Sequence, residues 1–253
     1  MITIKTKEDI EKLREGGKRH AEILRKVSEM VAPGVTTKEL DEYAHRLIIE
    51  GGDTPAFLNY TPEGVSYPYP ASLCVSVNDE IVHGIPSDFV LEEGDIVSLD
   101  LGLVHKGMIT DSAITVPCGH VSKDVQKLLE VTKGALNVAI KNIKPGNKTG
   151  DVGHAIEEFV KPYGFGIVKI LAGHGVGYSV HEDPYVPNYG KPGTGEELRP
   201  GMVLAIEPML NLGTDEVYVT EDEYTYITAD GKKSAHFEHT VVVTEEGCEV
   251  LTK

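Results

Sequence analysis

Cysteine is scarce in this sequence, and its three copies lie far apart. Cys74, Cys118 and Cys248 are odd in number and form no CxxC pair. A disulfide framework or a zinc site built from thiolates is therefore not expected, and a reducing compartment fits the composition. Residues 1–9 lack the apolar core of a signal peptide, and no apolar run approaches the length of a membrane span. We therefore predict a cytoplasmic protein that is not bound to a membrane.

Positive charge is also scarce. The chain has 24 lysines and arginines against 40 aspartates and glutamates, which gives a formal net charge of -16. There is no basic stripe, so nucleic acids and anionic membranes are not expected as main partners. The 253 residues, 40% of them hydrophobic, are enough for one large domain or two small ones with a substantial core.

Hydrophobic spacing and Pro-Gly breaks predict an α+β chain with helices at residues 7–31, 36–51, 121–143 and 149–163. Gly16 and Gly17 weaken the case for an unbroken first helix, whereas Thr36 and Glu39 are typical of a capping box. Strands are expected at residues 73–77, 202–207, 216–227, 234–243 and 248–251. The four prolines and four glycines of residues 184–201 predict a loop without a regular element.

The chain repeats part of its pattern after a shift of 112 residues. Pro33–Gly34 then falls on Pro145–Gly146, and Thr37 falls on Thr149. Both parts read as helix, Pro-Gly break, helix and then strands, which indicates an ancient duplication. We therefore expect a single domain over residues 1–253 with two similar α+β halves, at about 1–120 and 121–253. A site between the halves would draw its ligands from both.

Residues 96–116 predict a hairpin of two apolar strands, and each strand carries one aspartate, Asp100 or Asp111, where aspartate is rare. If the loop is His105–Lys106, the two acids lie directly opposite each other. If it is Lys106–Gly107, they are diagonal neighbours, and in both cases they share one face. Two adjacent carboxylates in apolar surroundings need a shared proton or a cation. From the hairpin alone, a solvated pair and a metal site are equally good interpretations.

Two further acids occupy strand-like positions. Glu207 ends an apolar run before Pro208, and Glu238 lies within an apolar segment. Each alone is more often an edge charge, but four isolated acids favour a shared cation. His174, flanked by glycines, is a fifth candidate ligand and favours zinc, cobalt, manganese or iron over calcium and magnesium. Charge balance favours two ions over one, and such a pair suits hydrolysis.

Seven segments resemble the methionine aminopeptidases of type I and come in that family's order. They are NDEIVHGIP (78–86), SLDLG (98–102), TDSA (110–113), GHGVG (173–177), HEDP (181–184), IEP (206–208) and FEHT (237–240). Together they span most of the chain and are highly specific, although none would suffice alone. The resemblance implies the pita-bread fold, in which two related α+β halves share a central antiparallel sheet and the metal site lies between them.

By position, the resemblance implies two divalent metal ions, cobalt, manganese, iron or zinc, held by five ligands. Asp100 and Asp111 would bind one ion, and Asp111 would bridge to the other, which His174 and Glu207 complete. Glu238 would bridge both ions. Glu207 would also carry a proton to the leaving amine.

The resemblance further implies two substrate-contacting and catalytic histidines, His83 and His181, which would otherwise pass for ordinary loop residues. The expected wall of a methionine pocket offers apolar area and polarisable contacts to sulfur, and it consists of Tyr60, Tyr69, Cys74 and Tyr224.

The implied activity is the removal of an N-terminal methionine that precedes a small second residue. A metal-bridging hydroxide would attack the first peptide bond. The expected partners are nascent polypeptide N-termini and the ribosome surface, and the expected state is a monomer.

Three features depart from the family's pattern. The loop 61–70 is longer than in common bacterial forms, Val180 stands where an aromatic residue often precedes the histidine, and Tyr224 replaces a tryptophan. All three border the expected methionine pocket, so they are expected to change the shape of the pocket. None of them is at one of the five expected metal ligands.

Three other interpretations deserve comparison. A proline-directed peptidase on the same fold usually carries a large extra N-terminal domain. A non-catalytic peptide-binding module should have lost ligands, whereas all five are present here. A structural metal site fits less well than a catalytic one, because the acids lie beside mobile Gly-rich loops.

Overall fold

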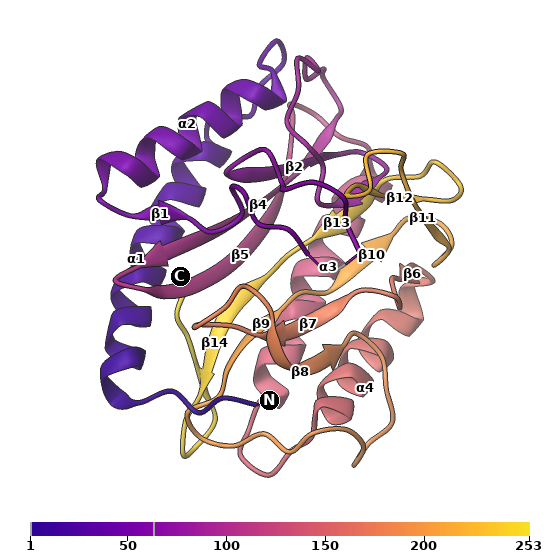
Figure 1. Ribbon diagram of the computed structural model, residues 1–253. Helices are drawn as coiled ribbons and strands as arrows, with labels where there is room; N and C mark the ends of the chain where they lie inside the picture. Colours follow the sequence, from indigo (N-terminus) through magenta and orange to yellow (C-terminus); the bar gives the residue numbers. More distant parts are fainter. Residues whose placement is uncertain (1, 63) are drawn as a thin grey trace.

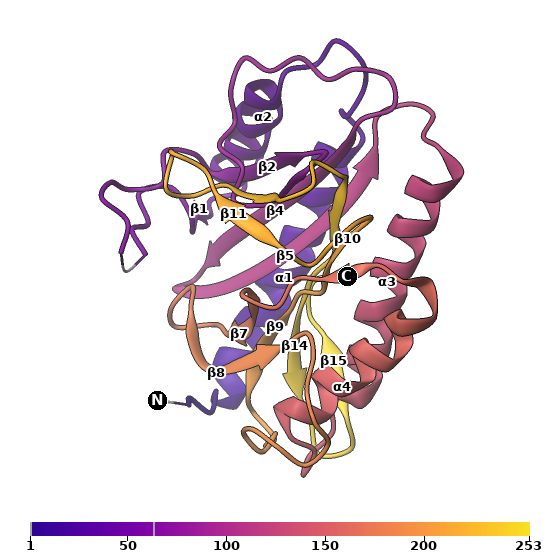
Figure 2. The ribbon, with the colours of Figure 1, turned by 90° about the vertical axis from the view of Figure 1, so that its right-hand side faces the viewer.

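The computed structural model of this chain describes residues 2–62 and 64–253, so that Met1 and Glu63 of the 61–70 loop lie outside it. Its helices are α1 (Lys7–Ser28), α2 (Thr37–Glu50), α3 (Lys123–Asn142) and α4 (Thr149–Val160), followed by the short 3₁₀ helix η1 (Lys161–Tyr163). The four expected α-helices are present, and α2 and α4 begin with the expected 112-residue shift. Helices α1 and α2 pack against one group of strands, and α3 and α4 pack against another (Figures 1 and 2).

The start of α2 follows the sequence prediction closely. The Thr36 hydroxyl accepts a hydrogen bond from the Glu39 N–H (3.2 Å), and the Glu39 carboxylate accepts one from the Thr36 N–H (2.7 Å). This capping box satisfies two backbone donors at the helix start that would otherwise lack a partner. The end of α1 is three residues earlier than expected, because Met30 and Val31 donate to the carbonyls of Val27 and Ser28 in a tighter final turn.

Strands of the first half form a four-stranded antiparallel sheet of β1 (Thr54–Pro55), β2 (Leu73–Val77), β4 (Ile96–His105) and β5 (Met108–Pro117). The second half contributes a five-stranded sheet in the order β15 (Cys248–Val250), β14 (His239–Val243), β9 (Val203–Ile206), β7 (Ala172–Gly175) and β8 (Glu182–Pro187).

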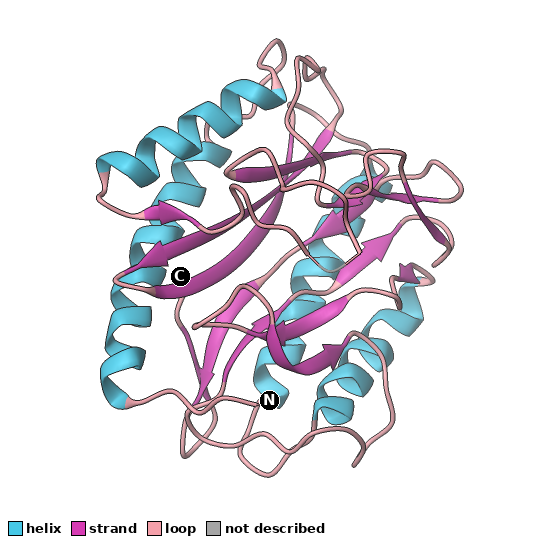
Figure 3. Cartoon of the chain, viewed as in Figure 1, coloured by secondary structure: helices cyan, strands magenta, loops and turns pink. Residues whose placement is uncertain are grey.

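Two smaller antiparallel sheets complete the described strands. One has the order β13 (Ser234–His236), β10 (Met209–Asn211) and β6 (Gly166–Ile167). The other has the order β11 (Val217–Val219), β12 (Tyr226–Thr228) and β3 (Glu80–Val82). Figure 3 shows the strands in the interior, with helices and loops around them. The expected α+β class is confirmed.

The two larger sheets are joined where β5 lies beside the chain that leads into β14. The Glu238 N–H donates to the Ala113 carbonyl (2.8 Å), and the Thr240 hydroxyl donates to the Asp111 carbonyl (2.6 Å). Ser112 adds a third bond from its hydroxyl to the Glu238 carbonyl (2.7 Å). These bonds fix two of the predicted ligands, Asp111 and Glu238, at one junction.

Two strand predictions and one loop prediction need correction. Residues 216–227 form β11, a loop and β12, because the Asp222 carboxylate accepts from the N–H groups of Tyr224 and Thr225 and turns the chain. Residues 234–243 divide into β13 and β14 at Glu238, whose N–H bonds to the other sheet. The first residues of the expected 184–201 loop belong to β8, where prolines are tolerated because β8 is an edge strand.

Two large hydrophobic clusters fill the space between helices and strands. One is formed by α1 and α2 with β2 and β4, and its buried residues include Leu24, Leu40, Val75 and Leu99. The other is formed by α3 and α4 with strands of the second half and includes Leu128, Ile156 and Leu204. Each helix pair thus buries its apolar face against its own strands. Within the described residues, no helix combines the length and the apolar character needed to cross a membrane.

Helix α1 continues unbroken through Gly16 and Gly17, and both glycines are needed for close packing. A Cβ atom on Gly16 would lie 2.8 Å from Cβ of His105, and one on Gly17 would lie 2.3 Å from the Leu251 carbonyl oxygen. From the sequence alone, this pair is expected to weaken the helix. In the structure it lets α1 approach the tip of the β4–β5 hairpin and the last strand.

We predict that Gly17→Ala lowers the free energy of unfolding by about 1–3 kcal/mol, because the methyl group would overlap a backbone carbonyl. In an open helix the same change raises stability by about 0.5–1 kcal/mol. The matched control is Gly247→Ala, since a Cβ there meets nothing within 4 Å. Urea denaturation of both variants measures the difference, and a stability gain in Gly17→Ala would contradict the packing argument.

Candidate active site

The hairpin turn settles the register of the two aspartates. His105 pairs with Met108, so the loop is Lys106–Gly107, and both loop residues have positive φ, 50° and 79°. Asp100 is then opposite Ala113, and Asp111 is opposite Gly102. The two acids are diagonal neighbours, as the second of the two expected registers requires, and their side chains share one face.

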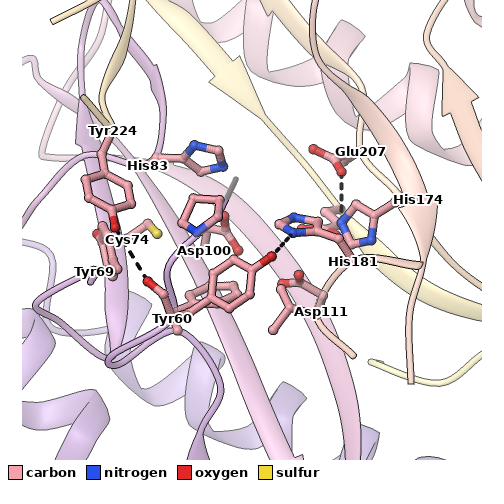
Figure 4. A pocket seen from close by; sticks show the side chains of 14 residues that line it. Tyr60, Tyr69, Cys74, His83, Asp100, Asp111, His174, His181, Glu207 and Tyr224 are labelled. Carbon is pink, nitrogen blue, oxygen red and sulfur yellow. Dashed lines mark hydrogen bonds and ion pairs between the residues drawn. The ribbon is translucent and has the colours of Figure 1, made fainter. Parts of the chain in front are cut away.

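All eleven sequence-predicted site residues line one cavity. Figure 4 shows the side chains of Asp100, Asp111, His174 and Glu207 directed toward a common space, with the tyrosines and His83 on the other side of it. Glu207 follows β9, and Glu238 precedes β14. The cavity holds about 90 Å³, well below the roughly 300–1,000 Å³ of a pocket for a drug-sized ligand, so it suits a single side chain.

The four acids are buried with their charges close together. Asp100, Asp111 and Glu238 are almost fully buried, and Glu207 is largely so. Burial raises the pKa of Asp100 to about 7. Burial, together with the neighbouring carboxylates, also raises the pKa of the other three well above the usual range. Without a cation, the four groups therefore cannot all be ionised at neutral pH.

Several polar atoms of the acids face one another without hydrogen bonds. Among the described residues, Oδ1 of Asp100, Oδ1 of Asp111 and Oε1 of Glu238 are buried and have no hydrogen-bond partner. Buried hydrogen-bond acceptors without a partner lower the stability of the fold. Carboxylate oxygens are also the hard metal ligands that divalent cations bind. Donor atoms of Asp111, His174 and Glu238 all lie within 4.8 Å of one another. The residues present thus fit a divalent metal site.

His174 is oriented for coordination through Nε2. Its Nδ1 lies 2.8 Å from the Gly175 carbonyl oxygen, which can only accept, so Nδ1 carries the proton. Burial lowers the pKa of His174 to about 3, which keeps the ring neutral and leaves the Nε2 lone pair free. This Nε2 lies 3.4 Å from Oε1 of Glu207. A hydrogen bond that fixes the tautomer is the usual second contact of a metal-binding histidine.

The two predicted substrate histidines border the acids on different elements. His181 contacts the His174 ring edge to face, with centroids 4.5 Å apart, and its Nδ1 forms a 2.8 Å hydrogen bond with the Tyr60 hydroxyl. His83 follows β3 and has φ 61°, a conformation that non-glycine residues rarely adopt. Burial lowers the pKa of His83 to about 4. Burial also lowers the pKa of His181 below its usual value, so both rings are mainly neutral at pH 7.

Next to the acids lies an apolar compartment with tyrosine walls. Tyr69 and Tyr224 meet edge to face with centroids 5.1 Å apart, and the Tyr69 hydroxyl donates to the Gly84 carbonyl (2.8 Å). Cys74 is buried and is paired with Asp100 across β2 and β4. Val180 is also buried in this wall. All four expected pocket residues are thus in contact with the same cavity.

The loop of residues 61–70 and Tyr224 are bonded to each other. The Tyr224 hydroxyl donates to the Tyr67 carbonyl, and the Tyr67 hydroxyl donates to the Asp222 carbonyl (2.6 Å). In Figure 2 the described part of this loop projects at the left of the molecule, and its Tyr67 bonds to Asp222 in the loop between β11 and β12. Tyr224 thus anchors Tyr67, and Pro62 of the same loop lines the cavity.

Two cavity residues were missed by sequence reasoning. Phe57 and Pro62 also line the cavity, and both come from the loop-like region 53–72. Phe57 packs against Gly102, where an added Cβ would lie 2.6 Å from its ring. Nothing in the local pattern of that region distinguishes Phe57 from a surface residue, because its burial depends on the distant β4 strand.

The loop that carries His181 is tied down by Glu182. This carboxylate accepts hydrogen bonds from the backbone N–H of Tyr178 (2.6 Å) and from Nζ of Lys5 (2.6 Å), and it is bonded to the Thr3 hydroxyl. The side chains of Lys5 and Glu182 are only 1% and 7% exposed. Such a nearly buried pair, joined by further donors, fixes the residue next to His181 in space.

Known proteins resemble this chain over its whole length. The family model described as metallopeptidase family M24 matches residues 11–245. A methionine aminopeptidase 1 from Bacillus subtilis is 45% identical over 253 residues, which is 100% of both chains. The crystal structure of a methionine aminopeptidase from Thermotoga maritima has a TM-score of 0.96 and 46% identity, covering 100% of both chains.

A more distant structure shows the same fold in a longer protein. The prolidase from Pyrococcus furiosus has a TM-score of 0.80 and 25% identity, over 99% of this chain but only 65% of its own. The fold is therefore the expected pita-bread fold, which these metallopeptidases share. With a family match over most of its residues and full-length relatives at this identity, the chain belongs to metallopeptidase family M24, in the group of the methionine aminopeptidases.

Proposed function

We propose that this chain is a metal-dependent methionyl aminopeptidase. It would remove the N-terminal methionine from nascent proteins and peptides whose second residue is small. The observation that carries this proposal is the meeting of four buried carboxylates and the free Nε2 of His174 beside a small apolar compartment. The relatives of the chain bear the same activity in their names.

We propose that Asp100, Asp111, His174, Glu207 and Glu238 hold two divalent ions. Two of these carboxylates would come from the β4–β5 hairpin, and the other three ligands would come from residues in or next to β7, β9 and β14. When bound, the ions would lower the pKa of water and polarise the carbonyl of the first peptide bond. Support comes from the orphaned oxygens of Asp100, Asp111 and Glu238 and from the charge of the four acids.

The remaining steps fall to side chains of the chain itself. With the Tyr60 hydroxyl donating to Nδ1, neutral His181 carries its proton on Nε2 and can donate to the substrate's peptide group. Neutral His83 offers a second ring nitrogen at the opposite wall of the cavity. Glu207, whose pKa is raised by burial, would take a proton and deliver it to the leaving amine.

The apolar compartment would receive the methionine side chain. Tyr60, Tyr69, Cys74 and Tyr224 form its wall, and buried aromatic rings make favourable contacts with a thioether sulfur. Val180 is smaller than an aromatic residue, so the compartment would discriminate gradually rather than sharply, by about 1–3 kcal/mol for each methylene. The second residue would lie against the acids, where only small side chains fit.

Several further expectations remain predictions that accompany this proposal. They are the division of one catalytic domain into duplicated halves at about 1–120 and 121–253, the choice among cobalt, manganese, iron and zinc, contact with the ribosome surface, a monomeric state and a cytoplasmic location. The separate hydrophobic clusters of the two helix pairs support the duplication.

Substrate choice is the first test. Met-Ala-Ser and Met-Gly-Ser should be cleaved well, Met-Leu-Ser and Met-Lys-Ser poorly, and norleucine-Ala-Ser at a rate between those of Met-Ala-Ser and Ala-Ala-Ser. The rates are measured with added Mn²⁺ or Co²⁺ by following the released amino acid. Equal rates for all first residues would indicate a general aminopeptidase, and preferential cleavage of Ala-Pro-Ser would indicate a proline-directed peptidase.

Metal dependence is the second test. A chelator should abolish activity, and Co²⁺, Mn²⁺ or Fe²⁺ should restore it. Asp111→Asn replaces a charged bridging ligand with a neutral one, so metal affinity should fall by at least the roughly 10–100-fold that the loss of an outer-shell partner costs. Elemental analysis and calorimetric titration measure the metal affinity. The control is Asp124→Asn, at an exposed position of α3. Full turnover by metal-free protein would overturn the mechanism.

The two histidines provide the third test. Their rings contact substrate rather than metal in our assignment, so His83→Ala and His181→Ala should each lower kcat by about 100-fold or more while metal content stays unchanged. His45→Ala is the control, because His45 bonds to Ser72 away from the cavity (2.8 Å) and should leave kcat unchanged. Metal loss in either site variant would show that the ligand shell is misassigned.

A further inference from the structure

One buried histidine near the acids has no role in the function proposed above. His236 is the last residue of β13, and its side chain is 1% exposed. Its backbone is fixed by Thr115, whose hydroxyl accepts from the His236 N–H (2.8 Å) and donates to the His236 carbonyl (2.7 Å). The backbone of His236 is therefore held by Thr115, and its ring takes no part in these bonds.

The ring of His236 makes no hydrogen bond within residues 2–62 and 64–253. Both Nδ1 and Nε2 are buried and unpartnered there. A neutral imidazole always carries one N–H donor and one acceptor, so this ring leaves two polar groups unsatisfied. Native proteins seldom tolerate such an arrangement, because each unsatisfied group lowers stability.

The ring is directed at two of the proposed ligands. Nε2 lies 3.8 Å from Oε2 of Glu207 and 3.9 Å from Oε2 of Glu238. Both distances exceed the usual hydrogen-bond length of about 2.9 Å by roughly 1 Å, so the ring is next to both carboxylates without bonding to either. His236 does not line the cavity, whereas Glu207 and Glu238 do. The ring thus lies within 4 Å of both carboxylates but does not itself line the cavity.

We propose that His236 is a positioning residue of the metal centre. Its Nε2–H would donate to the carboxylate of Glu207 or Glu238 and hold this ligand in its metal-binding orientation. This inference rests on the proposed metal site. Carboxylate ligands of metals generally accept such outer hydrogen bonds, which orient them and strengthen metal affinity. An apolar residue of similar size would fill the same volume but could not donate.

The proposal makes opposite predictions for stability and for metal binding. His236→Leu removes a buried donor and acceptor without partners, so the melting temperature in chelator should equal or exceed that of the unchanged protein. The same change should raise the Kd for Mn²⁺ by about 10–100-fold. His236→Gln keeps an N–H donor and should restore most of the Mn²⁺ affinity. A role in packing alone would lower the melting temperature and leave Kd unchanged.

The experiment is a calorimetric titration of the metal-stripped full chain with Mn²⁺, together with thermal unfolding in chelator. His45→Leu is the matched control, since it removes a histidine with a known partner away from the site and should lower the melting temperature without changing Kd. An unchanged Kd in His236→Leu would overturn the proposal, and so would a lower melting temperature in chelator or failure to fold. Equal weakening by leucine and glutamine would also overturn it, because it would indicate direct coordination by the imidazole.

The outcome is separable from that of the proposed function. Mn²⁺ binding is read without any substrate, so the result for His236 stands even if Met-Ala-Ser is not cleaved. If the unchanged protein fails to bind Mn²⁺, the proposed metal function fails first. If it binds Mn²⁺ and cleaves the peptide but His236→Leu behaves identically, only the positioning role is lost.

Discussion

Mutual repulsion among four buried carboxylates is the constraint on which this structure depends. Asp100 and Asp111 come from one hairpin, and Glu207 and Glu238 come from the other half of the chain. Bringing them together opposes folding, so the surrounding scaffold must hold them rigidly. Bonds between Glu238 and Ala113 and between Thr240 and Asp111 do this, since they join the two larger sheets at the point where the acids meet. Divalent metal ions, which the family uses, then have a prepared site among these acids.

Helix α1 adds to this rigidity, because it lies close to the hairpin. Gly16 and Gly17 allow the helix to lie against His105 and Leu251, at the tip of the hairpin and near the end of the chain. His105 in turn bonds to Asp53 through Nδ1 (2.7 Å), and Arg19 bonds to the same carboxylate (2.6 Å). The hairpin that carries two acids is thus held at its tip by a helix as well as along its length by strands.

Local patterns were sufficient where the deciding contacts are local. The capping box at Thr36 and the hairpin of residues 96–116 follow from neighbouring residues, and the shared face of Asp100 and Asp111 follows from strand geometry. Family motifs supplied His83 and His181, whose neighbourhoods carry no such signal. Phe57 and His236 could not be found, because their significance depends on Gly102 and on Glu207 and Glu238, which are remote in sequence. Glu238 likewise divided one expected strand into two by bonding to the other sheet.

The buried pair of Lys5 and Glu182 links the segment before α1 to the loop of His181. Segments held by a few side-chain bonds open locally with lower free energy than core strands, which open only on global unfolding. Breaking the bonds of Lys5 and Thr3 to Glu182 would therefore release the loop, while the strands that carry the acids stay closed. Hydrogen exchange would then be faster in residues 178–182 than in β4 and β5. The loop that carries His181 would in this sense open as a cooperative unit separate from the strands that carry the acids.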